Sequence, residues 1–262
     1  MRKPIEEAAK ALRGCYGNKP IAPMREYFGP FDGDTAYAVQ DANTRYWCRE
    51  GRIAVGRKIG LTSDAVQKQL GVDQPDFGVL FDDMRIADRG YLDPGLCLQP
   101  KAEAEIAFVL RKSLTSRNTT AAEFADAVDT VHASIEVVDS RITDWKITFA
   151  DTVADNGSSA FFVLSGTGQP IHGMDLWSAG MVMEVNGRVT SVGAGAAALG
   201  HPCNAGAWLA RCLANRDDPL QSGDIVLSGS LGPMVSISPG DHIRAVIGGI
   251  GECEFQFGNR TS

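Results

Sequence analysis

The sequence lacks the basic surplus of a nucleic-acid-binding protein. Its 262 residues contain 25 lysines and arginines against 32 aspartates and glutamates, so the formal net charge is −7. Binding of nucleic-acid phosphates needs a basic patch or stripe, and this balance therefore argues against a nucleic-acid partner. A small anionic substrate remains compatible with it, because one metal ion or one lysine can reverse the charge locally.

Long apolar runs are also missing. No stretch approaches the roughly 18 to 20 apolar residues that a membrane-spanning helix requires. The first residues, MRKPIEEAAKALRG, contain no apolar segment of the kind found in signal peptides. We therefore expect a cytoplasmic protein that does not associate with a membrane.

Cysteine and histidine do not form metal-binding patterns. The six cysteines include no C-x-x-C pair, and the four histidines lack the spacing of zinc ligands. An even number of cysteines permits disulfides, but a reducing cytoplasm favours free, mostly buried thiols. Nucleotide-binding motifs are absent too, since GRKIGLTS lacks the order of a P-loop and VGAGAAALGHP does not fit G-x-G-x-x-G.

The pattern of apolar residues divides the chain near residue 75. Before it, helical spacing recurs over 4–16, 34–50 and 63–70, interrupted by an apolar stretch around 53–59. After it, short segments rich in β-branched residues and bounded by turn residues predict strands. These strands are 106–110, 161–164, 180–185, 224–227, 234–237 and 242–247; two helices, 120–131 and 204–215, lie among them.

Helices followed by many short strands predict an α+β fold rather than a regular βαβ repeat. We expect a mostly helical N-terminal region, residues 1–75, and a β-rich core, residues 76–262. The pair Asn186-Gly187 between apolar flanks predicts a β-hairpin within that core.

Two glutamates in QPKAEAEIAFVL are candidate metal ligands. In a strand, Glu103 and Glu105 project from the same face, about 7 Å apart along the backbone. Like charges on one face repel, and a hard divalent cation such as Mg²⁺ or Mn²⁺ would remove that cost. Spacing alone leaves a second interpretation open, an exposed strand face on which both carboxylates are solvated.

A third glutamate lies within the apolar stretch of ASIEVVDSR. Burial of Glu136 alone would be expensive, so it needs a cation or a hydrogen-bonding partner. It is either a metal ligand or one member of a structural ion pair. Asp139 and Arg141 follow closely and could form a local ion pair.

Lys58 lies in the glycine-bracketed, otherwise apolar segment GRKIGLTS. A buried ammonium group needs an anionic partner, so Lys58 could bind a substrate carboxylate or stabilise an enolate. Alternatively, it is a surface lysine whose aliphatic part packs on the protein while its charge stays in water.

Two further polar positions follow turn signals. In GVDQPDFG, Asp76 is predicted to lie in a turn, either presented into a cleft or as an ordinary turn aspartate. In DNGSSAFF, Ser158 and Ser159 precede a predicted strand, as hydroxyl donors or as turn residues.

Together, and in this order, these segments resemble the 2-oxopent-4-enoate (2-hydroxypenta-2,4-dienoate) hydratase family of the fumarylacetoacetate hydrolase superfamily. The resemblance extends from Ile21 to Gly249. It rests on GRKIGLTS, LGVDQPDFGVLFDDM, QPKAEAEIAFVL, EVVDSR, DTVADNGSSAFFVL, LGHPCNAGAWLA and SGSLGPMVSISPGD.

The resemblance implies a metal-dependent hydro-lyase that converts 2-hydroxypenta-2,4-dienoate to 4-hydroxy-2-oxopentanoate in meta-cleavage catabolism of aromatic compounds. It implies a rolled mixed β-sheet as the catalytic core and a homo-oligomer that can associate with an enzyme of the same pathway. The implied site has Mg²⁺ or Mn²⁺ on a glutamate triad, two catalytic residues and a further substrate contact. These are Glu103, Glu105 and Glu136 for the metal, Lys58 and Asp76 for catalysis, and Lys58 with Ser158 for substrate binding.

Three alternatives to the hydratase can be compared with the sequence pattern. The 4-oxalocrotonate (2-oxo-3-hexenedioate) decarboxylase shares the glutamate triad, the lysine and the ADN-x-S motif. Arg57, QPDFG and SLGPM resemble the hydratase more closely. SVGAGAAALGHP and Asp139 also occur in decarboxylase-like members of the family. A C–C hydrolase of the superfamily would need a His-Glu pair, and no histidine lies in such a motif. A non-catalytic binding protein would lack a triad glutamate, and none is missing.

Overall fold

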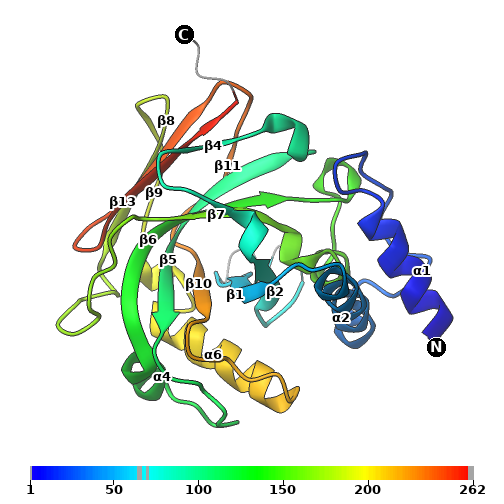
Figure 1. The fold of residues 1–262 in the computed structure, drawn as a ribbon, viewed down its shortest axis with the longest axis horizontal. Coiled ribbons are helices and arrows are strands. Elements are labelled where there is room, and N and C mark those ends of the chain that lie inside the picture. The colour runs from blue at the N-terminus through cyan, green and yellow to red at the C-terminus, as the bar shows by residue number, and fades with distance from the viewer. Residues whose placement is uncertain (1, 64–66, 69–70, 259–262) are drawn as a thin grey trace.

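The computed structural model describes residues 2–63, 67–68 and 71–258, and Figure 1 shows its fold. Its longer helices are α1 (Arg2–Arg13), α2 (Gly33–Arg49), α4 (Ala121–Ala127), α5 (Phe149–Ala154) and α6 (Pro202–Asn215). Its strands are β1 (Ala54–Gly60), β2 (Asp76–Phe81), β3 (Arg85–Ile86), β4 (Gly90–Leu92), β5 (Pro100–Leu110), β6 (Val128–Asp139), β7 (Ser159–Leu164), β8 (Gly180–Val185), β9 (Arg188–Ala194), β10 (Ile225–Ser230), β11 (Val235–Ser236), β12 (His242–Ile247) and β13 (Gly251–Phe257).

The strands form two mixed sheets. The larger has the order β2-β1-β10-β5-β6-β7-β3, with β11 paired to β5, and the smaller has the order β4-β13-β12-β8-β9. Most pairs are antiparallel, but β1 pairs with β10, β3 with β7 and β4 with β13 in parallel. Long β5 and β6 curve through the middle of the molecule, and the smaller sheet lies on the side opposite to α1 and α2 (Figure 1).

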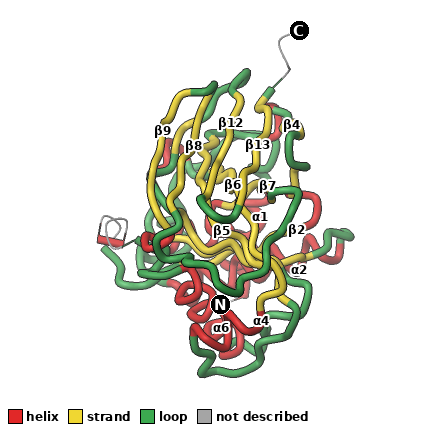
Figure 2. Tube along the Cα trace, turned by 90° about the vertical axis from the view of Figure 1, so that its left-hand side faces the viewer, coloured by secondary structure: helices red, strands yellow, loops and turns green. Residues whose placement is uncertain are grey.

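Three hydrophobic cores hold the described residues together. The smallest contains residues of β2, β7 and β10, and the other two differ in size. The larger contains residues of β5, β6, β12, β13 and α6, so it fills the space between the sheets and under the long C-terminal helix. The smaller joins α1 and α2 to α5, for example through Leu12, Val39 and Val153. Figure 2 shows the strands of the smaller sheet gathered at one end of the molecule and α6 at the other.

The α+β fold with mixed sheets is confirmed, and so are the two helices at the N-terminus. Most of the helix predicted over 63–70 lies outside the described residues. A domain boundary near residue 75 stays a prediction. The apolar stretch before it is β1, which pairs with β2 and β10 inside the larger sheet.

Several local predictions are confirmed. All six predicted strands occur, two of them, β8 and β12, with the predicted bounds. Asn186 and Gly187 connect β8 to β9 with φ of 54° and 73°, the positive values that a type I′ hairpin turn requires. All six cysteines are free as predicted, but only three of them are buried, so the expectation of mostly buried thiols is half right.

The helix predicted over 120–131 is only partly right. Residues 121–127 form α4, whose first turn is capped by Thr120 and Glu123. From Val128 the chain becomes β6, which pairs with β5 along its length. The alanine-rich start favours a helix, but pairing with β5 and the β-branched Val128 and Val131 determine the rest.

Candidate metal centre and active site

Alternation along β5 places the acidic side chains on one face. Ala102, Ala104 and Ile106 point into the larger core, so Glu103 and Glu105 point to the opposite face of the sheet. The same alternation holds on β6, where Ile135 and Val137 are in the core and Glu136 lies between them. The alternating pattern of each strand thus explains why these carboxylates point away from the larger core.

Strand pairing brings the three glutamates together. Glu103 is the direct partner of Glu136 across the antiparallel pair of β5 and β6. One carboxylate oxygen from each of Glu103, Glu105 and Glu136 lies within 4.8 Å of the others. Two oxygens bound to one ion at 2.0–2.6 Å lie at most about 5 Å apart, so a single cation can contact all three.

The triad is under electrostatic stress that a cation would relieve. Burial and the neighbouring Glu136 raise the pKa of Glu103 to about 7. Burial, Glu136 and Glu103 raise the pKa of Glu105 well above its ordinary value. Oε1 of Glu105 and Oε1 of Glu136 are buried and have no hydrogen-bonding partner among the described residues. Unpartnered, crowded carboxylate oxygens are the donor set that Mg²⁺ and Mn²⁺ prefer.

Lys58 closes one side of this cluster. Its Nζ lies 2.9 Å from Oε2 of Glu136 and donates a hydrogen bond of 3.0 Å to the carbonyl oxygen of Gly157. Its side chain is 3% exposed, so it is no surface lysine. Burial alone would lower the pKa of Lys58, but the carboxylates of Glu136 and Asp76 raise it, and the amine stays charged.

Asp76 is a strand residue, and its prediction as a turn residue is wrong. It begins β2, lies opposite Gly60 of β1 and is 1% exposed. A Cβ added at Gly60 would lie 2.2 Å from Oδ1 of Asp76, so only glycine leaves room for this carboxylate. Burial raises the pKa of Asp76, against the opposing effect of the Lys58 charge. The group can therefore carry a proton nearer to neutral pH than an exposed aspartate.

A left-handed turn carries the remaining polar contacts. Asn156, Gly157 and Ser158 have φ of 59°, 61° and 54°, a conformation that non-glycine residues rarely adopt and that is often found at functional sites. The Asn156 side chain fixes the turn to β2 by accepting a hydrogen bond from Val79 N–H and donating one to Val79 O. The turn thereby presents the Gly157 carbonyl to Lys58.

Ser158 is linked to the acid of the site through a hydroxyl. Its Oγ lies 3.2 Å from Oγ1 of Thr152, whose side chain in turn lowers the pKa of Asp76 against the effect of burial. All three side chains are buried. Thr152 therefore lies between Ser158 and Asp76.

Sequence reasoning missed the backbone partners of the site. The Gly157 carbonyl accepts from Lys58, and Gly229 N–H donates a 2.8 Å hydrogen bond to Oε2 of Glu105. Glycines in ADNGSS and LSGSLG signalled close backbone approaches, but no pattern indicated which side chain each would meet. The local ion pair expected between Asp139 and Arg141 is not formed: Arg141 binds Asp155 at 2.6 Å, and Asp139 accepts hydrogen bonds from Leu98 and Gln99.

Comparison with known proteins shows the family to which the chain is similar. The family "Fumarylacetoacetate (FAA) hydrolase C-terminal" matches residues 69–257, more than two thirds of the chain. A 2-keto-4-pentenoate hydratase of Paraburkholderia xenovorans is 49% identical over 253 residues, 96% of this chain and 94% of that protein. A 2-hydroxyhexa-2,4-dienoate hydratase of Comamonas testosteroni is 40% identical over 251 residues, 95% of this chain and 94% of that protein.

A solved structure has nearly the same fold. It is the 4-oxalocrotonate decarboxylase of Pseudomonas putida G7 in complex with magnesium and adipate. The similarity has a TM-score of 0.94 at 34% identity and covers 98% of both chains. No helix among the described residues is long and apolar enough to cross a membrane.

Proposed function

Because the chain belongs to the fumarylacetoacetate hydrolase family, we propose that it is a divalent-metal-dependent hydratase of 2-hydroxypenta-2,4-dienoate (2-oxopent-4-enoate). The product is 4-hydroxy-2-oxopentanoate, formed in meta-cleavage catabolism of aromatic compounds. The observation that carries this proposal is the buried cluster of Glu103, Glu105 and Glu136 beside Lys58 and Asp76. Relatives with identities of 40–49% over nearly the whole chain are named as hydratases of such dienoates.

Mg²⁺ or Mn²⁺ is the proposed cofactor, held by Glu103, Glu105 and Glu136. Three protein ligands leave positions open for substrate and water on an ion that prefers six oxygens. The ion supplies Lewis-acid stabilisation of negative charge at the 2-oxygen of the substrate. The fit is supported by the unpartnered oxygens of Glu105 and Glu136.

Lys58 has a fixed electrostatic role in this proposal. Held by Glu136 and the Gly157 carbonyl, its ammonium group is fixed in a buried position and stays charged. A preorganised charge in a water-poor site stabilises the negative charge that develops on an enolate more strongly than water does. Lys58 therefore stabilises the dienolate that forms when the 2-hydroxyl group loses its proton, and the enolate that forms again when water adds at C4.

Asp76 is the proposed proton-transfer group. Its raised pKa suits it to accept the proton of the 2-hydroxyl group and donate it to the terminal carbon, and then to accept a proton from the water that adds at C4 and donate it to C3. Ser158, joined to Asp76 through Thr152, is the proposed further substrate contact and orients the hydrogen bonds of the carboxyl group.

Decarboxylation of 2-oxo-3-hexenedioate is the second candidate, favoured by the structural similarity to the 4-oxalocrotonate decarboxylase. Both reactions pass through an enolate, and the same Lys58 and triad serve either. The test is to supply freshly generated 2-hydroxypenta-2,4-dienoate and 2-oxo-3-hexenedioate separately, with Mg²⁺ or Mn²⁺. Hydration of the first is expected, and CO₂ release from the second without hydration of the first would contradict the proposal.

A homo-oligomer in the cytoplasm, able to associate with a pathway enzyme, is part of the same proposal. Support for the homo-oligomer comes from large exposed apolar side chains: Val189 and Val192 on the edge strand β9 are each 60% exposed, and Trp177 is 57% exposed. Apolar side chains exposed on an unpaired edge strand favour pairing of that edge with a second copy of the chain. Light scattering after size-exclusion chromatography tests it, and a monomer at micromolar concentration would contradict it.

A further inference from the structure

The glutamate face of β5 continues past the triad to a lysine. Lys101 precedes Glu103 by two residues, so the two side chains lie on the same face of the strand. Glu105 and Glu136 are completely buried, whereas Glu103 and Lys101 are partly exposed. The site is therefore more accessible at the Lys101 end of β5 than at its other end.

Lys101 has an aromatic partner instead of a carboxylate. Its Nζ lies 4.3 Å from the centroid of the Trp145 ring, a cation–π distance. Among the described residues it forms no ion pair and no hydrogen bond. An ammonium group has three N–H donors, and a ring face does not satisfy them as a carboxylate would. Lys101 thus retains the capacity to bind an anion.

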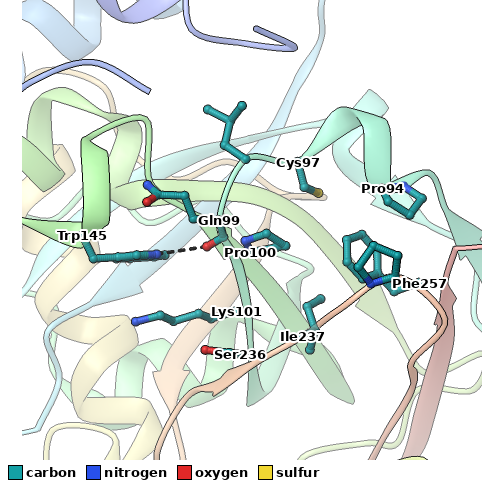
Figure 3. Close-up of a pocket in the computed structure, with 11 residues that line it drawn as sticks. Pro94, Cys97, Gln99, Pro100, Lys101, Trp145, Ser236, Ile237 and Phe257 are labelled. Atoms are coloured by element: carbon teal, nitrogen blue, oxygen red, sulfur yellow. Dashed lines mark hydrogen bonds between the residues drawn. The ribbon is translucent and has the colours of Figure 1, made fainter. Parts of the chain in front are cut away.

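Trp145 is held in place by an unusual loop. Trp145 and Asp144 have φ of 55° and 57°, both in the left-handed region. The indole N–H donates to the carbonyl oxygen of Gln99 at 3.0 Å, and Asp144 N–H donates to the Gln99 side chain at 2.8 Å. Figure 3 shows the indole held by this hydrogen bond and lying beside the Lys101 side chain. The fixed indole in turn positions the lysine.

Open space adjoins this pair. A cavity of about 420 Å³ is lined by Gln99, Lys101, Trp145, Ser236 and Ile237, among others. A volume above roughly 300 Å³ is in the range of small-molecule sites. The cavity adjoins the Lys101 end of the glutamate face and is not lined by the triad itself, so an organic acid of five or six carbons can contact Lys101 from this side.

The charge of the site also calls for a further cation. Glu103, Glu105, Glu136 and Asp76 with Lys58 give a net charge of −3 when all are ionised, and a divalent cation would change this to −1. With Asp76 protonated, which its raised pKa favours, the metal-loaded site has no net charge, and a further cation would make it attractive to an anionic substrate. Lys101 and Lys58 are the two cations that act on Glu103 in the described structure, and Lys58 is already engaged by Glu136.

We propose that Lys101, supported by Trp145, is a substrate-binding residue that contacts the carboxylate of the 2-oxo acid at the entrance of the site. The inference rests on the proposed function, since it assigns a residue to the binding of that substrate class. Lys101 acts in binding and not in the chemical step, because it lies at the partly exposed end of the glutamate face, whereas Lys58 and Asp76 are buried.

The test uses 2-oxopentanoate, a saturated acid that cannot be hydrated, in calorimetric titrations of the Mg²⁺-loaded protein. Lys101→Met is expected to weaken binding by about 10-fold or more, because a hydrogen bond to a charged group contributes roughly 1.5–3 kcal/mol. Lys101→Arg is expected to restore affinity to within about 3-fold through its own charge-assisted hydrogen bonds. The matched control is Lys112→Met, the same charge change just beyond the other end of β5, where Lys112 is exposed and pairs with Asp126.

Kinetics on the dienoate give an independent reading. Lys101→Met is expected to raise KM with kcat little changed, the pattern for loss of uniform binding. It is also expected to make kcat/KM less dependent on salt, because a steering charge has been removed. Equal affinities of wild type and Lys101→Met, or an equal loss in Lys112→Met, would overturn the inference while the wild type still hydrates the dienoate. A wild type that neither binds 2-oxopentanoate nor hydrates the dienoate would overturn the proposed function as well.

Discussion

Replacing Glu103 by glutamine separates the electrostatics of the triad from its catalytic role. In the metal-free protein, burial and the neighbouring carboxylates raise the pKa of Glu103 to about 7, against 4.5 for the free side chain. Such a group binds its proton more strongly in the folded than in the unfolded state. It therefore contributes stability that is fully present below pH 4.5 and is lost as the pH rises through about 7.

The size of the effect follows from the two pKa values. They differ by about 2.5, which at roughly 1.4 kcal/mol per pH unit corresponds to about 3 kcal/mol of destabilisation at pH 8. Glutamine keeps the shape of the side chain without the charge. Glu103→Gln should therefore stabilise the metal-free protein at pH 8 by up to about 3 kcal/mol, or roughly 6 to 10 °C in melting temperature for a chain of this length.

Thermal denaturation in the presence of EDTA at pH 5 and pH 8 measures this difference. The gain in melting temperature should be large at pH 8 and small at pH 5. In Mg²⁺ the order should reverse, because wild type gains the binding energy of the ion and the variant has lost one ligand. Glu6→Gln, which removes an exposed carboxylate from α1, is the matched control and should change neither value.

Two outcomes would refute the reasoning. A variant that is no more stable than wild type in EDTA at pH 8 would show that the three carboxylates do not repel one another in a buried site. A variant that gains as much from Mg²⁺ as wild type does would show that Glu103 is not a ligand. The second outcome would count against the metal centre itself.

The remaining predictions concern the acid, the serine and the buried ion pair. Asp76→Asn should lower kcat by about 100- to 10,000-fold, the usual contribution of a proton-transfer group. The Mg²⁺ affinity, measured by calorimetry, should stay within a few-fold of wild type. An unchanged kcat would exclude Asp76 as the proton-transfer group. Ser158→Ala should raise KM about 5- to 10-fold in steady-state assays, because a net hydrogen bond contributes about 1 kcal/mol. An unchanged KM would show that Ser158 does not contact the substrate. Arg141→Met should lower the free energy of unfolding by about 3–5 kcal/mol in urea titrations, since it leaves Asp155 buried without its partner; a loss below about 1 kcal/mol would contradict that account.

Local pattern determined several features of this protein. Alternation along QPKAEAEI places Glu103 and Glu105 on one face, because successive strand residues point to opposite sides whatever the strand pairs with. Asn186-Gly187 determines a hairpin for a similar reason, since the positive φ values of the turn are a property of those two residues. The order of motifs along the chain also identified the family and its six candidate site residues.

Tertiary structure decided how those residues meet. Only the register of β5 with β6 places Glu136 opposite Glu103, and the pairing of β1 with both β10 and β2 positions the strand that carries Lys58. Arg141 binds Asp155 rather than Asp139 two residues away, because the buried turn at 156–158 brings that carboxylate within reach. The end of α4 at Ala127 depends on the same β5–β6 pairing. Each of these outcomes rests on contacts between residues distant in sequence, whose energies do not appear in any local pattern.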